Sequence, residues 1–150
     1  MTASITMFQT GNKYLGDGTI DLDTNTFKVT LHTSTYVPNA ATQVVYADLT
    51  NELATAVGYT SGGATLASVV WTQSTVTMKF DATDVTWTAS GGSITCRYAV
   101  IRSTVTANGH VEPLVAYILL DVTPADVVTT DGNNLVLQWN ASGIMTSVIS

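Results

Sequence analysis

Residues 57–90 read VGYTSGGATLASVVWTQSTVTMKFDATDVTWTAS, and they contain the clearest strand pattern of the chain. Apolar residues alternate with polar ones at 76–80 and again at 85–87, on either side of a polar break at 81–84. A period of two places alternate side chains on opposite faces of a strand, so this stretch predicts two β-strands joined by a turn. The glycines at 58–63 predict another turn before them.

The same alternation predicts further strands on both sides of this stretch. They lie at 20–22 and 27–31, joined as a hairpin by the polar residues 23–26, and at 65–71, 93–102 and 135–139. In the fourth of these, Ile94, Cys96, Tyr98 and Val100 are expected to share one face. Leu114 to Leu120 reads LVAYILL and is apolar on both faces, which predicts a buried central strand.

One short helix is expected within residues 43–56, where apolar residues recur every fourth position and Asp48 or Thr50 is available as a cap. Residues 2–16 allow either a short helix or an arm. A chain of 150 residues is the size of one domain. We therefore predict a single mainly β domain, a β-sandwich of jelly-roll or Greek-key type, with an N-terminal arm at about 1–15 and an apolar tail at about 142–150.

The composition excludes several classes of function. Charged residues make up 11% of the chain, and only five are Lys or Arg, giving a net charge of −6. Binding to nucleic acid needs clustered positive charge, so we expect no nucleic-acid partner. The longest uncharged stretch, 53–78, is interrupted by glycines and hydroxyl side chains, so we expect no membrane span. The first sixteen residues lack the pattern of a secretory signal, which predicts folding in a cytosol.

No motif in the sequence predicts an enzyme, a metal site or a cofactor. Asp21 and Asp23 begin a calcium-loop pattern that lacks its glycine and its final Glu, so a hairpin turn is the better interpretation. Asp81 and Asp84 are interpreted as turn residues that bind backbone amides. The two histidines, at 32 and 110, are expected to be solvated. Cys96 alternates with apolar residues and is expected in the core.

The aromatic residues leave a sugar-binding alternative open. Trp87 and Trp139 alternate with Val85 and Leu137 and are therefore predicted to lie in the core. Tyr59 and Trp71 are the aromatic residues expected to be exposed. They are the candidates for a ligand-facing pair.

The order of several segments is similar to that of small virion proteins of tailed bacteriophages. The segments are GDGTIDLDTNTFKVTL, VYADLTNELA, GYTSGGATL, FDATDVTWTAS, ITCRYAVI and PLVAYILLD, and the similarity extends from about Gly16 to Ile144. The resemblance implies a structural protein of the virion, assembled in the bacterial host cytoplasm. Among such proteins, a capsid decoration (cement) protein fits the β-rich, motif-poor chain best.

A cement protein acts by burying surface at subunit junctions, so apolar residues near the two chain ends are the candidate contacts. They are Ile5, Met7, Phe8, Ile144, Met145, Val148 and Ile149. The expected partners are further copies of the chain and the major capsid protein. Two alternatives remain: a tail or head-fibre adhesin that binds a host saccharide, and a tail-tube or connector subunit that forms rings.

Overall fold

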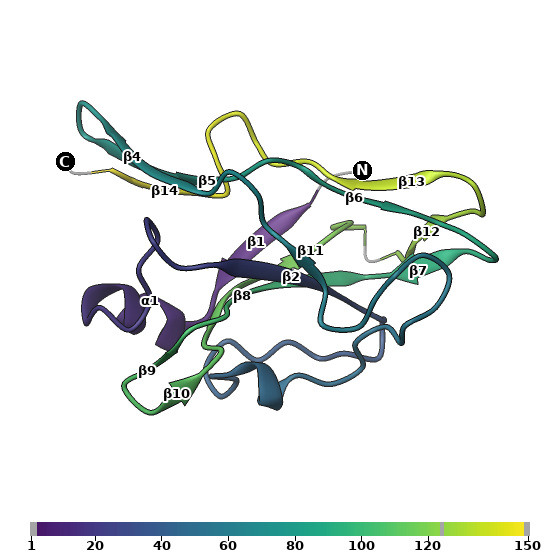
Figure 1. The fold of residues 1–150 in the computed structure, drawn as a ribbon, viewed down its shortest axis with the longest axis horizontal. Coiled ribbons are helices and arrows are strands. Elements are labelled where there is room, and N and C mark those ends of the chain that lie inside the picture. The colour runs from purple at the N-terminus through teal and green to yellow at the C-terminus, as the bar shows by residue number, and fades with distance from the viewer. Residues whose placement is uncertain (1–2, 124, 149–150) are drawn as a thin grey trace.

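The computed structural model describes residues 3–123 and 125–148, and it is mainly β (Figure 1). Its strands pair antiparallel throughout the described ranges. The helical elements in these ranges are α1 (Gln9–Gly16) and a single 3-10 turn, η1 (Tyr46–Asp48). The predicted β-rich class is confirmed.

A five-stranded sheet forms the lower layer in the view of Figure 1. Its order is β1 (Ser4–Met7), β11 (Leu114–Leu119), β8 (Tyr98–Ser103), β2 (Phe27–His32) and β3 (Ala64–Thr65). The apolar LVAYILL run forms β11, an interior strand as predicted, although β8 occupies the middle of the sheet. Buried clusters lie on both faces of the sheet, with Ile118 in one and Leu114 in the other, so β11 is apolar on both faces.

A second group of strands runs across the top of this sheet in Figure 1. It consists of β4 (Val70–Ser74), β5 (Thr77–Asp81) and β14 (Met145–Val148) in one sheet, and of β6 (Val85–Thr88) and β13 (Asn134–Leu137) in another. Phe27 of β2 meets Phe80 of β5 edge to face, with ring centroids 5.1 Å apart. This contact joins the two layers.

Two further strand pairs complete the described fold. They are β7 (Ile94–Cys96) with β12 (Val127–Thr129), and β9 (Thr106–Ala107) with β10 (His110–Val111). The Asn108-Gly109 turn predicted from the sequence joins β9 to β10, and both residues have positive φ.

The predicted strand at 93–102 is divided, which corrects the expected faces. Ile94 and Cys96 are buried in the same cluster as Ala99 and Ile101, whereas Val100 belongs to a second cluster on the other side of the sheet. Arg97 separates β7 from β8 and shifts the alternation by one residue. A one-residue shift exchanges the faces of every following side chain.

The hairpin predicted at 20–31 is wrong in its first half. Residues 19–26 form turns, and the regular strand begins at Phe27. The carboxylate of Asp21 accepts hydrogen bonds from the backbone amides of Asp23 (2.9 Å) and Thr24 (3.2 Å). Such local bonds compete with strand pairing. Ile20 is nevertheless buried, as the alternation predicted.

The helix predicted within 43–56 is also wrong, because only η1 is helical there. The carboxylate of Asp48 accepts bonds from the amides of Val44 (2.8 Å) and Val45 (3.0 Å), which tightens a single turn. The chain then runs alongside β2, where the amide of Leu53 donates to the carbonyl of Leu31 (2.9 Å).

The short helix of the fold lies near the N-terminus, and the predicted arm is not an arm over its described part. Ser4–Met7 pairs with β11 as β1, and α1 packs against the same strand. The tail is likewise a strand, because Met145–Val148 pairs with β5. Both ends of the described chain therefore form edge strands of the fold.

Candidate functional site

The structure brings four of the predicted contact residues together from the two ends of the chain. Ile5 and Met7 of β1 lie opposite Ile144 and Met145 at the start of β14, and all four line one hollow of about 350 Å³. Residues 139 positions apart in sequence thus share a site. Neither end of the chain predicts this proximity by itself.

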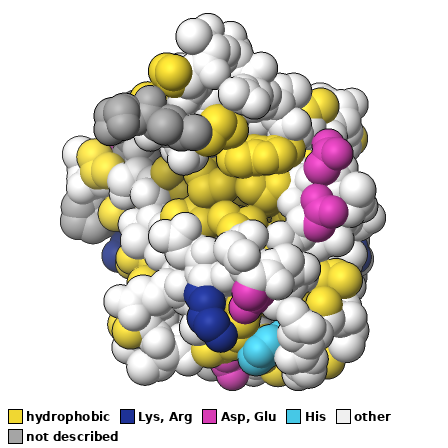
Figure 2. Space-filling view, turned by 90° about the vertical axis from the view of Figure 1, so that its left-hand side faces the viewer, with side chains coloured by type: hydrophobic (Ala, Val, Ile, Leu, Met, Phe, Trp, Pro, Cys, Tyr) yellow, Lys and Arg dark blue, Asp and Glu magenta, His cyan; other side chains and the backbone are white. Residues whose placement is uncertain are grey.

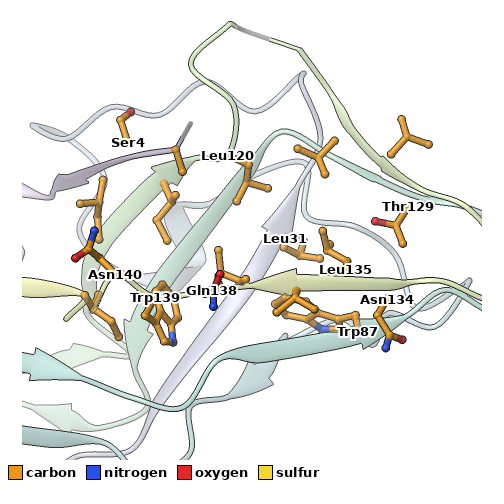
Figure 3. Close-up of a pocket in the computed structure, with 18 of the residues that line it drawn as sticks. Ser4, Leu31, Trp87, Leu120, Thr129, Asn134, Leu135, Gln138, Trp139 and Asn140 are labelled. Carbon is orange, nitrogen blue, oxygen red and sulfur yellow. The ribbon is translucent and has the colours of Figure 1, made fainter. Parts of the chain in front are cut away.

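This hollow continues into a larger one of about 970 Å³ that lies between the two layers. The two share Ile5, Asn140, Gly143 and Ile144, so we treat them as one feature and call it the groove. In Figure 3, Ser4 and Leu120 lie on one side of the groove, and Trp87 and Trp139 lie on the other.

Aliphatic side chains from both layers line the interior of the groove. Leu31, Ile118 and Leu120 come from the five-stranded sheet and the residue after it, and Val127 comes from β12. Leu135, Leu137 and Ile144 come from β13 and the residue before β14. A space-filling view of one end of the molecule shows hydrophobic side chains gathered in a central hollow, between the level of β4 and β14 above and of α1 below (Figure 2). A hollow of this kind is typical of a binding surface for an apolar partner.

A tight turn at 140–143 sets the position of Ile144 in the groove. The Asn140 side chain accepts a hydrogen bond from the amide of Ser142 (2.8 Å), and the amide of Gly143 donates to the carbonyl of Asn140 (2.7 Å). Gly143 has a φ of 97°, and a Cβ there would lie 2.7 Å from the carbonyl oxygen of Phe80. Only glycine allows this close approach, which brings the amide of Ile144 to the same carbonyl at 2.8 Å.

Trp87 and Trp139 lie in the wall of the groove formed by β6, β13 and the residues that follow β13. Trp87 is buried, as predicted, and Trp139 is half-buried against the same core. The indole nitrogen of Trp139 donates to the carbonyl of Thr83 (3.1 Å), and its backbone amide donates to the carboxylate of Asp84 (2.9 Å). Asp84 therefore binds an amide of a distant segment and not, as predicted, one of its own turn; the local bond is that of the Ala82 amide to the Asp81 carboxylate (3.0 Å).

The groove is uncharged over all the described residues that line it. None of them is Asp, Glu, Lys, Arg or His. The strands that border it, β1 with sequence SITM and β14 with sequence MTSV, contain neither a charge nor a proline. Natural sheets commonly protect a free edge with lysine, proline or a bulge. These two edges lack the first two of those protections.

The other three predicted contact residues do not join the groove. Phe8 is fully buried and packs edge to face against Tyr117 at 5.5 Å, on the opposite side of the sheet. Its predicted role as a surface contact is therefore wrong in this structure. Val148 is 63% exposed but does not line the groove, and Ile149 lies outside the described residues.

The predicted ligand-facing pair Tyr59 and Trp71 is also corrected. Tyr59 is 2% exposed; its hydroxyl donates to Glu52 (2.6 Å) and accepts from the amide of Leu31 (3.1 Å). Burial and the bond to Glu52 raise the pKa of Tyr59. Trp71 is half-buried against the core, opposite Phe80 on the neighbouring strand. The two side chains do not form an open aromatic platform.

Glu52 is the centre of a polar cluster that sequence reasoning missed. Its carboxylate accepts bonds from the hydroxyls of Tyr46 and Tyr59 and from the amide of Gly62 (2.6 Å). Burial raises the pKa of Tyr46 to about 12. The Arg102 guanidinium lies 3.9 Å from the centroid of the Tyr46 ring. The cluster fastens the irregular segment 46–62 to the sheet.

Arg102 is almost fully buried and pairs with Glu112 across the sheet edge. Its second terminal nitrogen donates to the carbonyl of Gly62 (3.0 Å). A buried guanidinium needs such partners because its desolvation is costly. These contacts assign Arg102 a structural role in holding the two segments together.

The prediction of solvated histidines is wrong for His32, whereas His110 is partly exposed. His32 is fully buried; its Nδ1 lies 2.9 Å from the carbonyl of Thr50 and its Nε2 lies 2.9 Å from the hydroxyl of Thr30. The carbonyl can only accept, so Nδ1 carries the proton in the neutral ring. Burial lowers the pKa of His32. His110 is half-buried and lies 3.0 Å from the hydroxyl of Tyr14.

Cys96 is buried in the core as predicted, and burial raises the pKa of its thiol to about 12. Within residues 3–123 and 125–148, no group of three or more His, Cys, Asp or Glu side chains is placed to hold a metal ion. In the same ranges, no helix has the length and apolar character needed to cross a membrane.

Comparisons with known proteins identify no relative. No protein-family model, no curated protein and no solved structure matches this chain.

Sequence reasoning missed the groove itself, although it predicted that some of the residues lining it face inward. Leu135 and Leu137 share one face of a predicted strand, and Leu120 ends the LVAYILL run; Leu120 and Leu137 are buried, and Leu135 is partly buried against the core. Their faces border an opening between the layers. The opening exists because certain strands lie at the edges of their sheets. The alternation of residues within one strand does not indicate whether that strand is an edge strand.

Proposed function

We propose that this protein is a non-enzymatic structural protein of a tailed bacteriophage virion, and that it serves as a capsid decoration protein. One observation carries the proposal. Contact residues expected from the two ends of the chain meet in a single apolar, uncharged groove between two free strand edges. The similarity of the sequence segments to small virion proteins supports the phage origin.

We also propose that the domain is a β-sandwich. Two antiparallel layers joined by contacts such as Phe27 with Phe80 agree with a β-sandwich of jelly-roll or Greek-key type. In such a domain an open side between the layers offers backbone groups and apolar side chains together. Both are features that a subunit contact uses.

A decoration protein stabilises a capsid because it binds the assembled shell more tightly than it binds separated subunits. The free energy of this stabilisation grows with the ratio of the concentration of free decoration protein to its dissociation constant from the capsid. A few buried apolar residues supply most of the binding free energy at such a contact. We assign that role to the groove, with further copies and the major capsid protein as partners in the virion assembled in the host cytoplasm.

The test is to mix the purified chain with separated capsids and separated tails, and to measure the bound chain by mass spectrometry. Saturable binding to capsids, with a rise in their thermal stability, is the expected result. Binding to tails alone would favour a tail subunit. Binding to neither would refute the virion role.

A second candidate, saccharide binding by an adhesin, is favoured by one observation. Trp87 and Trp139 line the groove together with the side-chain amides of Asn134, Gln138 and Asn140. Flat indole rings match the apolar faces of sugars, and amides can bind hydroxyl groups. Titration of tryptophan fluorescence against a saccharide panel tests this candidate. No change with any saccharide would remove it.

A further inference from the structure

Among residues 3–123 and 125–148, β1 is an edge strand, and no backbone partner is found for the outward-pointing groups of that edge beside the groove. The amide of Phe8 donates to the carbonyl of Val115 on β11 (3.1 Å), and backbone groups of successive strand residues point in opposite directions. Ile5 and Met7 therefore direct their amides and carbonyls away from β11. The β11 side agrees, because the amide of Leu120 donates toward β8, to the carbonyl of Arg97 (3.0 Å).

The side chains of Ile5 and Met7 also face the groove. Ile5 is 44% exposed and Met7 is half-buried, and both line the hollow beside Ile144. An added strand at this edge would receive hydrogen bonds from β1. It would also place alternate side chains between the two layers. Addition of a strand to a free edge is a recurrent way for proteins to bind extended segments.

We propose that the added strand is β1 of a second copy of this chain, paired antiparallel about a two-fold axis. The inference rests on the proposed structural role, and it names the partner in the groove. Two identical strands related by a two-fold axis satisfy each other's backbone groups without any special sequence. Ile5 and Met7 of both copies then form one continuous apolar strip, which faces β14 of each copy across the groove.

A second copy would meet the groove with an uncharged surface. Each chain has a net charge of −6, so two copies repel each other as whole molecules. The groove lining and β1 contain no charged residue, so pairing two β1 edges there buries no charge and brings no like charges into contact. A partner recognised by charge would instead need charged residues at its contact.

The geometry makes a sharp prediction about cross-linking. In an antiparallel pair about a two-fold axis, one residue faces its own copy. The outward direction of Ile5 and Met7 makes a self-pair of either one hydrogen-bonded, and a self-pair of Ser4 or Thr6 non-hydrogen-bonded. Axes at Ile5 or Thr6 pair three residues of each four-residue strand, whereas axes at Ser4 or Met7 pair only one, so we expect Ile5 or Thr6 on the axis. The Cα atoms of such pairs are about 5.5 Å and about 4.5 Å apart, respectively, and both distances allow a disulfide.

The experiment uses the full chain in solution. Ile5→Cys and Thr6→Cys variants are oxidised at a series of protein concentrations, and disulfide-linked dimers are measured on a non-reducing gel. We expect one of the two to form a dimer efficiently. The wild-type chain is the control, since Cys96 is buried. Absence of dimer in both variants would overturn the proposal.

A second measurement tests association without an added thiol. Sedimentation equilibrium of wild type should show a monomer–dimer equilibrium, and Ile5→Lys should raise the dissociation constant by about tenfold or more. Val111→Lys is the matched control, because Val111 is 58% exposed on β10, away from the groove. Equal unfolding midpoints of the two variants exclude loss of folding as the cause. Equal weakening by both variants, or a wild-type chain that stays monomeric, would overturn the proposal.

These outcomes are separable from those of the virion test. A chain that binds capsids but neither dimerises nor cross-links through β1 retains the virion role and loses this inference. A chain that dimerises through β1 but binds no virion component retains this inference and loses the virion role.

Discussion

Substitution of Gly11 by alanine should destabilise the protein, although helix propensity predicts the opposite. Gly11 lies inside α1, where alanine is normally more stable than glycine by about 0.5–1 kcal/mol. In this structure, however, α1 approaches β11 closely at Gly11. A Cβ there would lie 2.6 Å from the carbonyl oxygen of Leu114 and 2.9 Å from that of Val115.

The magnitude follows from the atoms that would be contacted. Both are backbone oxygens of an interior strand, so neither can turn aside as the end of a side chain could. The helix must move by several tenths of an ångström, and such overpacking typically costs about 1–3 kcal/mol. After subtraction of the gain in helix propensity, Gly11→Ala should lower the free energy of unfolding by about 0–2.5 kcal/mol, with a central value of about 1 kcal/mol.

Gly16 offers a matched control at the last residue of the same helix. A Cβ there meets no atom within 4 Å, so Gly16→Ala should be neutral or stabilise by up to about 1 kcal/mol. Urea unfolding followed by tryptophan fluorescence measures both free energies. Opposite signs for the two variants are expected. A stabilised Gly11→Ala would refute the close packing of α1 on β11, and with it the fixed position of β1 beside the groove.

Two further predictions concern the polar groups beneath the irregular segment. Glu52→Gln should lower the free energy of unfolding by about 3–4 kcal/mol. Glu52 accepts three hydrogen bonds, and a bond to a charged acceptor contributes about 1.5–3 kcal/mol whereas a bond to a neutral one contributes about 0.5–1.5 kcal/mol. The exposed Asp23→Asn should change the free energy of unfolding by less than about 0.5 kcal/mol, and equal effects of the two variants would contradict the cluster. For His32, burial lowers the pKa in the folded state, so only the unfolded state binds a proton just below about pH 6.5. The stabilisation from its neutral ring is therefore complete above that pH and is lost as the pH falls. The urea unfolding midpoint of wild type should decrease as the pH falls below about 6.5, and it should decrease less in His32→Gln. The same decrease in both proteins would exclude His32 as its source.

Alternation predicted the strands whose pattern is set by a single buried face. Residues 76–80 and 85–87 form β5 and β6 with Phe80 and Trp87 inward, because one face of each strand packs on the core. A period-two pattern records that burial directly. The apolar LVAYILL run predicted an interior strand for a related reason.

The predictions failed where side chains bind the nearby backbone. At 19–26 the Asp21 carboxylate organises turns, and near 46–48 the Asp48 carboxylate does the same. Apolar residues are buried in the first segment and half-buried in the second, so their spacing resembled a strand in one case and a helix in the other. Periodicity records burial, whereas the local conformation follows from the bonds of the short polar side chains.

The candidate site was predictable as a set of residues but not as a place. Apolar residues near both chain ends indicated a contact, and four of them do meet. Their meeting depends on the non-local pairing of β1 with β11 and of β14 with β5, which leaves both strands at sheet edges. An acidic chain with uncharged, proline-free edges beside an apolar opening has kept the features that monomeric sheets usually remove. These features support the proposal that another strand covers the groove.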